Sequence, residues 1–232
     1  PLEPVPDIID QALVDAAENG RNGKGTVVVF AAGNGNENVI SDPFAAHPLT
    51  IAVAAVNSRG IKSSYSDFGD AIWVAAPSSG NHLMQGIVTT DVLGDLGYAV
   101  PGTPGALDPE GHVTSNFGGT SSAAPAVAGL IGLVFSANSE LTVLQVKDIL
   151  RRTSRKIDRL HGQYQPDEDG FLKSPFYGYG LVDAHAAVRA AHIGCVPEET
   201  EICLPTSTCD DGPLPLVPEA CNGVDDNCDG VI

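Results

Sequence analysis

The sequence predicts an α/β fold in which buried parallel strands alternate with helices. Three apolar runs carry this prediction, at residues 26–31, 50–56 and 72–77. Such runs, rich in β-branched or small apolar residues, are typical of parallel strands buried on both faces. Helical patterns lie before the first run and after the last. This alternation favours crossover connections within one layered domain.

A first helix is expected from about Asp7 to Asn19, because Asp7 can cap its start and Gly20 can end it. Apolar residues at helical spacing predict one buried stripe along it: Ile8, Ile9, Ala12, Leu13, Ala16 and Ala17. The strand expected at 26–31 leads into the loop 31–36. Open α/β sheets place their sites in loops at the C-terminal ends of strands, so this loop is a candidate site.

The second half of the chain predicts a long loop and three helices. Residues 94–119 are rich in Gly and Pro with little periodicity, and we expect a surface loop there. Thr142 and Gln145 have the spacing of a capping box, which predicts a helix to about Thr153. Its expected core contacts are Leu144, Ile149 and Leu150. A last helix is expected to reach about Ala191.

Between that loop and the capping box, glycines and hydroxyl residues precede an apolar run. Gly118 and Gly119 are followed by Thr120, Ser121 and Ser122, and residues 123–135 are apolar on every side. A helix without a polar face is expected in the interior. Its positive N-terminal end favours developing negative charge. A serine there is a candidate nucleophile if a base lies beside it, and the alternative is an ordinary N-cap serine.

The stretch from Gly119 to Pro125, Gly-Thr-Ser-Ser-Ala-Ala-Pro, resembles the nucleophile motif of the subtilisin-like serine proteases, the subtilases of peptidase family S8. Further blocks through about residue 192 resemble the kexin/furin branch: Gly33-Asn34-Gly35, Tyr65-Ser66-Asp67, Ile87-Val88-Thr89-Thr90-Asp91 and Gly178-Tyr179-Gly180-Leu181-Val182-Asp183-Ala184. The resemblance implies a subtilisin-like three-layer fold with a parallel sheet. Residues 1–193 would be the C-terminal part of its catalytic domain.

The resemblance also implies roles for two residues. Ser121 would attack the scissile carbonyl and Asn34 would donate to the oxyanion; for Asn34 alone, a left-handed turn is the alternative. In subtilases the catalytic Asp and His motifs come before the matched region, and residues 1–33 hold no His. We interpret all six histidines as structural or solvated: His47, His82, His112, His161, His185 and His192. This chain alone is therefore expected to be inactive.

Substrate and metal residues are open to two interpretations each. By resemblance, Ala31, Ala32 and Gly33 would line the pocket for the residue before the cut. Asp42 would select a basic residue there, or would only form a turn with Pro43. Glu37 and Asp67 would help bind Ca²⁺ below the pocket, or would be exposed solvated carboxylates.

The charge of the chain favours some partners over others. The formal net charge is −17, of which −9 falls in residues 195–232, where there is no Lys or Arg. This makes nucleic acid an unlikely partner and favours basic peptides and divalent cations. No run of eighteen apolar residues is present, so we expect no membrane span.

Residues 194–232 form a tail of different composition. All five cysteines lie there: Cys195, Cys203, Cys209, Cys221 and Cys228. Clustered cysteines indicate disulfides and an oxidising compartment, so we expect a secreted or cell-surface protein with Cys221 paired to Cys228. Oxygen ligands between and after these two suit calcium: Asp225, Asp226, Asn227 and Asp229. The tail resembles Cys/Asp-rich metal-binding repeats of myxobacterial surface proteins. The alternative is an acidic linker that is held by disulfides and binds nothing.

Together these observations predict a secreted, calcium-dependent serine endopeptidase acting on polypeptides. The rival interpretation is an inert pseudoprotease, or an adhesive surface module with a calcium-binding tail. Ser121 and Asn34 are both intact, which favours the enzyme because no structural need demands both. A phosphate site at the Gly118–Gly119 turn is disfavoured because the P-loop ending is missing.

Overall fold

The computed structural model describes residues 4–80, 84–93, 96–103 and 105–192. The chain divides into two units, 1–194 and 195–232, and all described residues belong to the first. The expected Cys221–Cys228 pair and the expected calcium ligands of the tail (Asp225, Asp226, Asn227 and Asp229) therefore lie outside the described residues.

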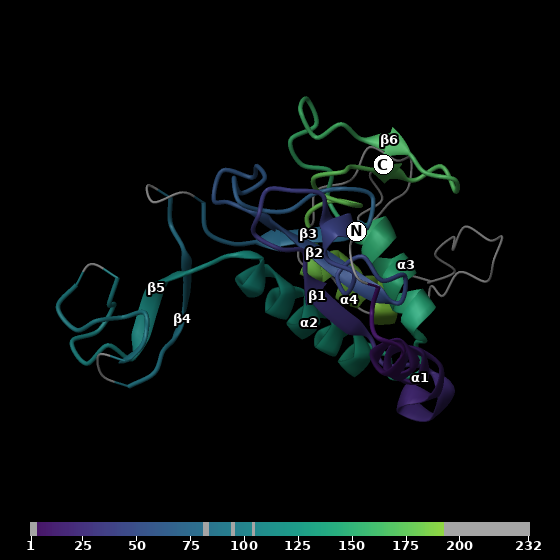
Figure 1. Ribbon diagram of the computed structural model, residues 1–232, viewed down its shortest axis with the longest axis horizontal. Coiled ribbons are helices and arrows are strands. Elements are labelled where there is room, and N and C mark those ends of the chain that lie inside the picture. The colour runs from purple at the N-terminus through teal and green to yellow at the C-terminus, as the bar shows by residue number, and fades with distance from the viewer. Residues whose placement is uncertain (1–3, 81–83, 94–95, 104, 193–232) are drawn as a thin grey trace, which may run out of the picture. The chain divides into compact units, whose positions relative to one another are not determined.

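A three-stranded parallel sheet forms the centre of the first unit (Figure 1). Its order is β1 (Val28–Ala31), β2 (Thr50–Val56), β3 (Ile72–Pro77). The middle strand β2 is buried at every position, as its continuous apolar run predicts. The α/β class and the parallel sheet are confirmed. The bounds of β2 and β3 are those expected, whereas β1 starts two residues later than expected.

Three helices form where the second half of the sequence predicts helices. Helix α2 (Thr120–Ala137) packs against all three strands, and α4 (Ala184–His192) lies against both α2 and α3 (Val143–Thr153) (Figure 1). Helix α3 begins with the predicted capping box, in which Gln145 N donates to Thr142 Oγ1 at 3.3 Å and Thr142 N donates to Gln145 Oε1 at 2.8 Å. The expected core position of Leu144 is wrong, since that side chain is 77% exposed on the outer face.

Helix α1 (Asp7–Gly23) is kinked near its end. Gly20, Arg21 and Asn22 have non-helical backbone angles, so the regular helix ends where Gly20 predicts. Pro6 is the N-cap and Asp7 lies in the first turn without a capping bond. The predicted buried stripe is wrong for Ile8, Ile9 and Ala12, which are exposed, and of the six residues expected in it only Leu13 is buried.

Arg21 ties this kink to the far end of α2. Its guanidinium donates to three backbone carbonyls, those of Gly25 at 3.2 Å, Leu141 at 2.9 Å and Ser139 at 2.6 Å. It also lies 3.6 Å from the ring centroid of Phe135. The connection into β1 is thereby held against the segment that follows α2.

Helix α2 is buried on one face and exposed on the other, so its expected complete burial is wrong. Val127, Ile131 and Val134 face the interior, while Leu133 is 57% exposed. A Cβ at Gly129 or Gly132 would meet no atom within 4 Å. By length and composition alone α2 is apolar enough to cross a membrane, but core helices pass the same test, and one face of α2 packs on the sheet.

The remaining elements are short. A 3₁₀ turn spans Val39–Ser41, and β6 (Gln165–Pro166) pairs with β7 (Leu172–Lys173). An antiparallel ribbon joins β4 (Ile87–Thr90) to β5 (Val113–Phe117). The expectation of one unbroken loop over 94–119 is therefore wrong. The polar centre of β5 gives no apolar strand signal, and its pairing partner is distant in sequence.

Candidate functional site

Two segments far apart in the sequence meet at the candidate site. The loop after β1 carries Asn34, and the turn before α2 carries Gly119 and Thr120. Asn34 Oδ1 accepts hydrogen bonds from Thr120 N at 2.9 Å and from Thr120 Oγ1 at 3.1 Å. Gly33 N donates to the same Thr120 hydroxyl oxygen at 3.2 Å. Asn34 therefore lies next to the residue that precedes Ser121.

These bonds orient the amide of Asn34. A backbone N–H can only donate, so the atom that faces Thr120 N must be the amide oxygen. The NH₂ group of Asn34 is then left to donate elsewhere. The amide packs closely on Gly119, where a Cβ would lie 3.4 Å from Oδ1 and 3.5 Å from Nδ2. Gly119 also has a φ of 77°, a conformation that favours glycine.

Ser121 lies exposed in the first turn of α2, between the buried residues Thr120 and Ser122. The helix N-cap is Gly119 and no side chain caps it, so the alternative of an N-cap serine is wrong. Thr120 N donates to Asn34 and Ser122 N donates to Gly119 O at 3.0 Å. Within the described part of the chain, Ser121 N has no acceptor. The turn thus presents a hydroxyl and a free N–H side by side.

A cluster of hydroxyl groups holds the turn before Ser121. Gly119 N donates to the Tyr65 hydroxyl at 3.2 Å, and Gly119 O accepts from Ser78 Oγ at 2.7 Å and from Ser122 Oγ at 3.0 Å. The Tyr65 hydroxyl in turn donates to Ser79 O at 2.7 Å. Both backbone groups of Gly119 are therefore fixed by side chains, from the loop before β3, from the residue after β3 and from α2.

Asp67 holds the other half of the site. Its carboxylate is buried, and Oδ1 accepts from Gly35 N at 2.7 Å and from Glu37 N at 3.1 Å. Its backbone N donates to Gly33 O at 3.0 Å. These three bonds bracket Asn34 on both sides. A Cβ at Gly33, whose φ is 109°, would collide with the Asp67 carboxylate.

The residues expected around the substrate pocket lie near Asn34 in the sequence. Ala31 ends β1, and the buried Ala32 continues the ladder by donating from N to Val53 O at 3.0 Å. Asp42 Oδ1 accepts from Phe44 N at 2.9 Å and Ala45 N at 3.1 Å. This geometry is that of the turn which the Asp42–Pro43 pair predicts.

The carboxylates expected to bind calcium do not by themselves form a full site. Calcium takes six to eight oxygen ligands, and here Oδ1 of Asp67 already accepts two N–H groups while Glu37 is exposed. Among described residues, the group of three close ligand side chains is Asp108, Glu110 and His112. Backbone hydrogen bonds, that from His112 foremost, lower the pKa of Asp108. Its carboxylate serves chiefly to close that loop.

Two of the described histidines pair closely with aspartates. His47 Nε2 pairs with Asp10 at 2.9 Å and His161 Nδ1 with Asp158 at 3.1 Å. His82 lies outside the described residues. Within the ranges that the structure describes, no hydrogen bond joins Ser121 to a histidine.

Sequence reasoning missed the part that four residues play in shaping the site. They are Tyr65, Ser78, Thr120 and Asp67, the last through its bonds to backbone N–H groups. Thr120 carries a local signal, because it adjoins the candidate nucleophile. The other three touch the site only through folding, and nothing in their spacing predicts which backbone groups they bind.

Comparison with known proteins agrees with this arrangement. The subtilase family profile matches residues 4–180. A calcium-dependent protease of Nostoc sp. is 44% identical over 201 residues, which cover 86% of this chain and 30% of that protein. Human proprotein convertase subtilisin/kexin type 6 is 31% identical over 210 residues, covering 89% of this chain and 20% of that protein. The chain therefore spans less than a third of these relatives.

Solved structures show the same fold. The crystal structure of the serine protease of Aeromonas sobria matches with a TM-score of 0.74 at 24% identity, over 82% of this chain and 41% of that one. At this identity the likeness shows the fold alone. The family profile, which matches residues 4–180, establishes that the chain belongs to the subtilase family.

Proposed function

We propose that this chain is the C-terminal part of the catalytic domain of a serine endopeptidase, with Ser121 as nucleophile and Asn34 as oxyanion donor. One observation carries the proposal: Thr120 occupies the amide oxygen of Asn34 and leaves its NH₂ group beside the turn that presents Ser121.

The chemistry follows from these groups. Ser121 Oγ bonds to the scissile carbonyl carbon, the π electrons move to the carbonyl oxygen, and the Oγ proton passes to a base. The negative oxygen then accepts from Asn34 Nδ2 and from the free Ser121 N. Both donors are fixed before reaction, which is the requirement for electrostatic stabilisation of the transition state.

The base and its orienting acid come, in this proposal, from a segment N-terminal to Pro1. An independent observation supports such a segment. Helix α2, which carries the nucleophile in its first turn, exposes an apolar face further along its length, including Leu133 and the open positions at Gly129 and Gly132. Contiguous exposed apolar surface marks a protein interface. One covering segment would bury this face and could supply the missing base.

The test is peptide cleavage by the protein expressed with the coding sequence upstream of Pro1. Ser121→Ala should abolish cleavage. The matched control is Ser136→Ala, which changes an exposed serine near the other end of the same helix. Equal activity in both variants would refute the proposal. Absence of activity in every form, together with retained folding, would favour the pseudoprotease or adhesive module.

A preference for basic residues before the cut is the finer part of the proposal. The acidic charge of the chain and the kexin and convertase relatives support it. Asp42 is the candidate for reading the basic side chain, although one of its oxygens serves the turn. Asp42→Asn should keep the turn and should reduce cleavage after Arg more than cleavage after Leu. An equal reduction in cleavage after Arg and after Leu would mean that Asp42 only forms the turn and does not select the substrate residue.

Calcium is the proposed cofactor, because a relative is named a calcium-dependent protease. Glu37 and Asp67 are candidate partial ligands that would need further oxygens, and Asp225, Asp226, Asn227 and Asp229 are the candidates in the tail. Bound calcium would supply local positive charge and rigidity. If the tail site exists, Asp225→Ala with Asp229→Ala should reduce the gain in thermal stability that calcium gives over EDTA. An unchanged gain in thermal stability would contradict calcium binding by the tail.

Secretion or surface exposure completes the proposal. The Aeromonas sobria relative is named an extracellular serine protease, and it is 30% identical over 217 residues. Five tail cysteines fit an oxidising compartment. Thiol counting with and without reductant on the secreted protein tests this: five free thiols in the unreduced protein would contradict it.

A further inference from the structure

We propose that Tyr65 and Asp67 are positioning residues that together fix the nucleophile turn relative to the oxyanion donor. This inference rests on the proposed function, because it names what holds the two reacting parts in place. The two side chains are separated by a single residue, and they bind opposite halves of the site.

Asp67 controls the donor half. Its Oδ1 accepts from the backbone N–H groups of Gly35 and Glu37, one and three residues after Asn34. Its own N–H donates to Gly33 O, the residue before Asn34. The loop has no regular secondary structure up to Asn38, so these bonds replace the ladder that would hold a strand. Without the carboxylate, two partly buried N–H groups lose their acceptor.

Tyr65 controls the nucleophile half. Its hydroxyl accepts from Gly119 N at 3.2 Å and donates to Ser79 O at 2.7 Å. Its backbone carbonyl accepts from Asn36 N at 2.8 Å. Tyr65 therefore contacts the donor loop through its backbone and the nucleophile turn through its side chain. Two residues later, Asp67 repeats the contact to the donor loop.

Ser66 anchors this tripeptide to the middle of the sheet. Its side chain is fully buried, and Oγ accepts from Ala55 N of β2 at 3.0 Å. The segment cannot shift without breaking that bond. Tyr65–Asp67 is thus a rigid bridge from the central strand to both reacting parts. Small displacements in such an arrangement cost about 10²-fold in rate per ångström.

The first experiment compares two substitutions at Asp67 in the protein that carries its upstream segment. Asp67→Asn keeps an oxygen for both N–H groups and removes the charge, whereas Asp67→Ala removes the acceptor. We expect Asp67→Ala to lower kcat by roughly 10- to 100-fold with little change in KM, and Asp67→Asn to restore most of it. If Asp67→Asn lowers kcat as much as Asp67→Ala does, and excess calcium restores kcat in neither variant, then the charge of the carboxylate matters. The proposal that its hydrogen bonds to Gly35 and Glu37 hold the loop would then be refuted.

A matched control separates positioning from general stability. Asp167 is an aspartate away from the site whose Oδ1 also accepts from two backbone N–H groups, here within its own turn: Asp169 N at 3.1 Å and Phe171 N at 2.8 Å. Asp167→Ala should lower thermal stability to a similar degree without the loss in kcat. Equal losses of kcat in the two alanine variants would overturn the proposal.

A double substitution tests whether Asp67 acts through Asn34. If Asp67 only places the amide of Asn34, then Asp67→Ala should lower kcat much less in an Asn34→Ala background than in the wild type. Additive losses would mean that Asp67 acts by another route and would overturn this half of the proposal.

Tyr65→Phe tests the other half. It removes the acceptor for Gly119 N and should slow acylation of Ser121 about tenfold. The control is Tyr179→Phe, which loses a hydroxyl bond to Asp167 Oδ2 of 2.6 Å away from the site. The rate of labelling by a serine-reactive fluorophosphonate should fall only in Tyr65→Phe. Equal labelling of both variants would refute this half.

Hydrogen exchange makes the result independent of peptide cleavage. In Asp67→Ala the amides of Gly35 and Glu37 should exchange faster, while the β2 amide of Ala55 stays protected. Unchanged exchange rates at Gly35 and Glu37 would refute the proposal that the Asp67 carboxylate holds this loop, even if the enzyme is active. Faster exchange in a protein that never cleaves peptides refutes the proposed function instead, and with it the positioning role.

Discussion

The amide oxygen of Asn34 is held by both hydrogen-bond donors of Thr120, its N at 2.9 Å and its Oγ1 at 3.1 Å. One oxygen thus joins two residues that are 86 positions apart in the sequence. This sharing fixes which end of the amide is free. It also makes the nucleophile helix and the first strand of the sheet interdependent at a single point.

Replacement of Asn34 should therefore reduce turnover rather than substrate binding. Loss of an oxyanion donor lowers kcat about 10²- to 10³-fold, a figure measured on another subtilase. We expect Asn34→Ala to lower kcat in this range with KM nearly unchanged in steady-state peptide cleavage. The control is Asn57→Ala, which alters the asparagine that follows the neighbouring strand β2. A similar loss from both variants would contradict the donor role.

Thr120→Val should affect both stability and rate. Valine has the shape of threonine but offers no hydroxyl, so Gly33 N loses its acceptor and Asn34 Oδ1 loses one donor. A buried N–H without a partner costs about 1–3 kcal/mol, which urea unfolding would measure. Thr120→Ser keeps the hydroxyl and should behave nearly as the wild type. Equal destabilisation by serine and valine would mean that packing of the methyl group dominates.

Arg21→Met should destabilise the fold by about 1–2 kcal/mol. The substitution keeps a long side chain over Phe135 but removes the donors to three carbonyls and the cation–π contact. Chemical unfolding of the two proteins gives the difference. The exposed Arg59, changed to Met, serves as the comparison and should have little effect. No difference between the two variants would show that Arg21 contributes nothing to stability.

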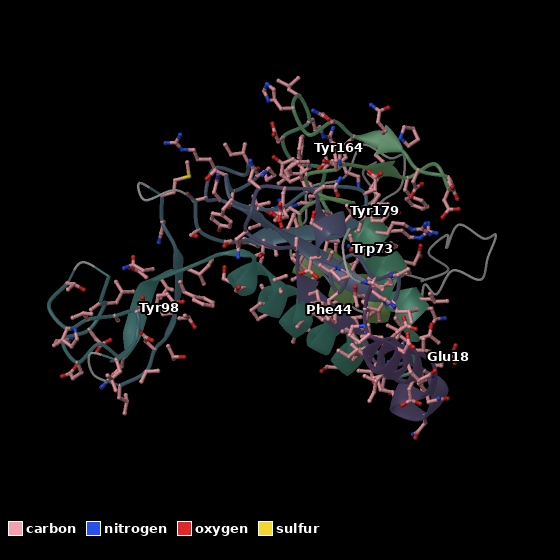
Figure 2. The ribbon with its side chains drawn as sticks, in the orientation of Figure 1. Glu18, Phe44, Trp73, Tyr98, Tyr164 and Tyr179 are labelled. Carbon is pink, nitrogen blue, oxygen red and sulfur yellow. The ribbon has the colours of Figure 1, made fainter. Side chains whose placement is uncertain are left out.

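Lys147 predicts a rise in stability with pH in the alkaline range. The Lys147 amine lies over the ring of Trp73, which packs against Tyr179 (Figure 2). Burial, and secondarily the charge of Lys173, lower the pKa of Lys147 from 10.5 to about 8. Between these values the unfolded chain binds more protons than the folded one, so the free energy of unfolding rises with pH. The slope is at most about 1.4 kcal/mol per pH unit.

Lys147→Met removes the amine, and with it the difference in bound protons between the unfolded and the folded chain. The stability of the wild type relative to Lys147→Met should therefore increase between pH 8 and pH 10 in denaturant titrations at fixed ionic strength. A constant difference over this range would mean that the amine keeps its ordinary pKa of 10.5 in the folded protein.

Much of the fold follows from local sequence pattern. The bounds of β2 and β3 and the capping box of α3 were predictable, because burial on both faces and helix capping each leave a local signature. The exposed face of α2 was not predictable. An apolar pattern on every side of a helix says that partners are needed, and it cannot say which of them lie within this chain.

For the site, the sequence indicates the reacting groups better than their supports. Ser121 and Asn34 each stand at the end of a recognisable element, one at a helix start and one after a strand. Ser66 and Asp67 act on backbone groups of other segments, Ala55 N and Gly35 N. Any polar residue could do this, so only the folded arrangement reveals it.

The empty space above Gly129 and Gly132 makes these two positions built-in reporters of assembly. Alanine at either position raises helix propensity by about 1 kcal/mol relative to glycine where nothing lies above it. The same methyl group would clash where another polypeptide packs tightly on α2. One pair of substitutions would therefore shift the melting temperature upward in the bare chain and downward in the assembled domain.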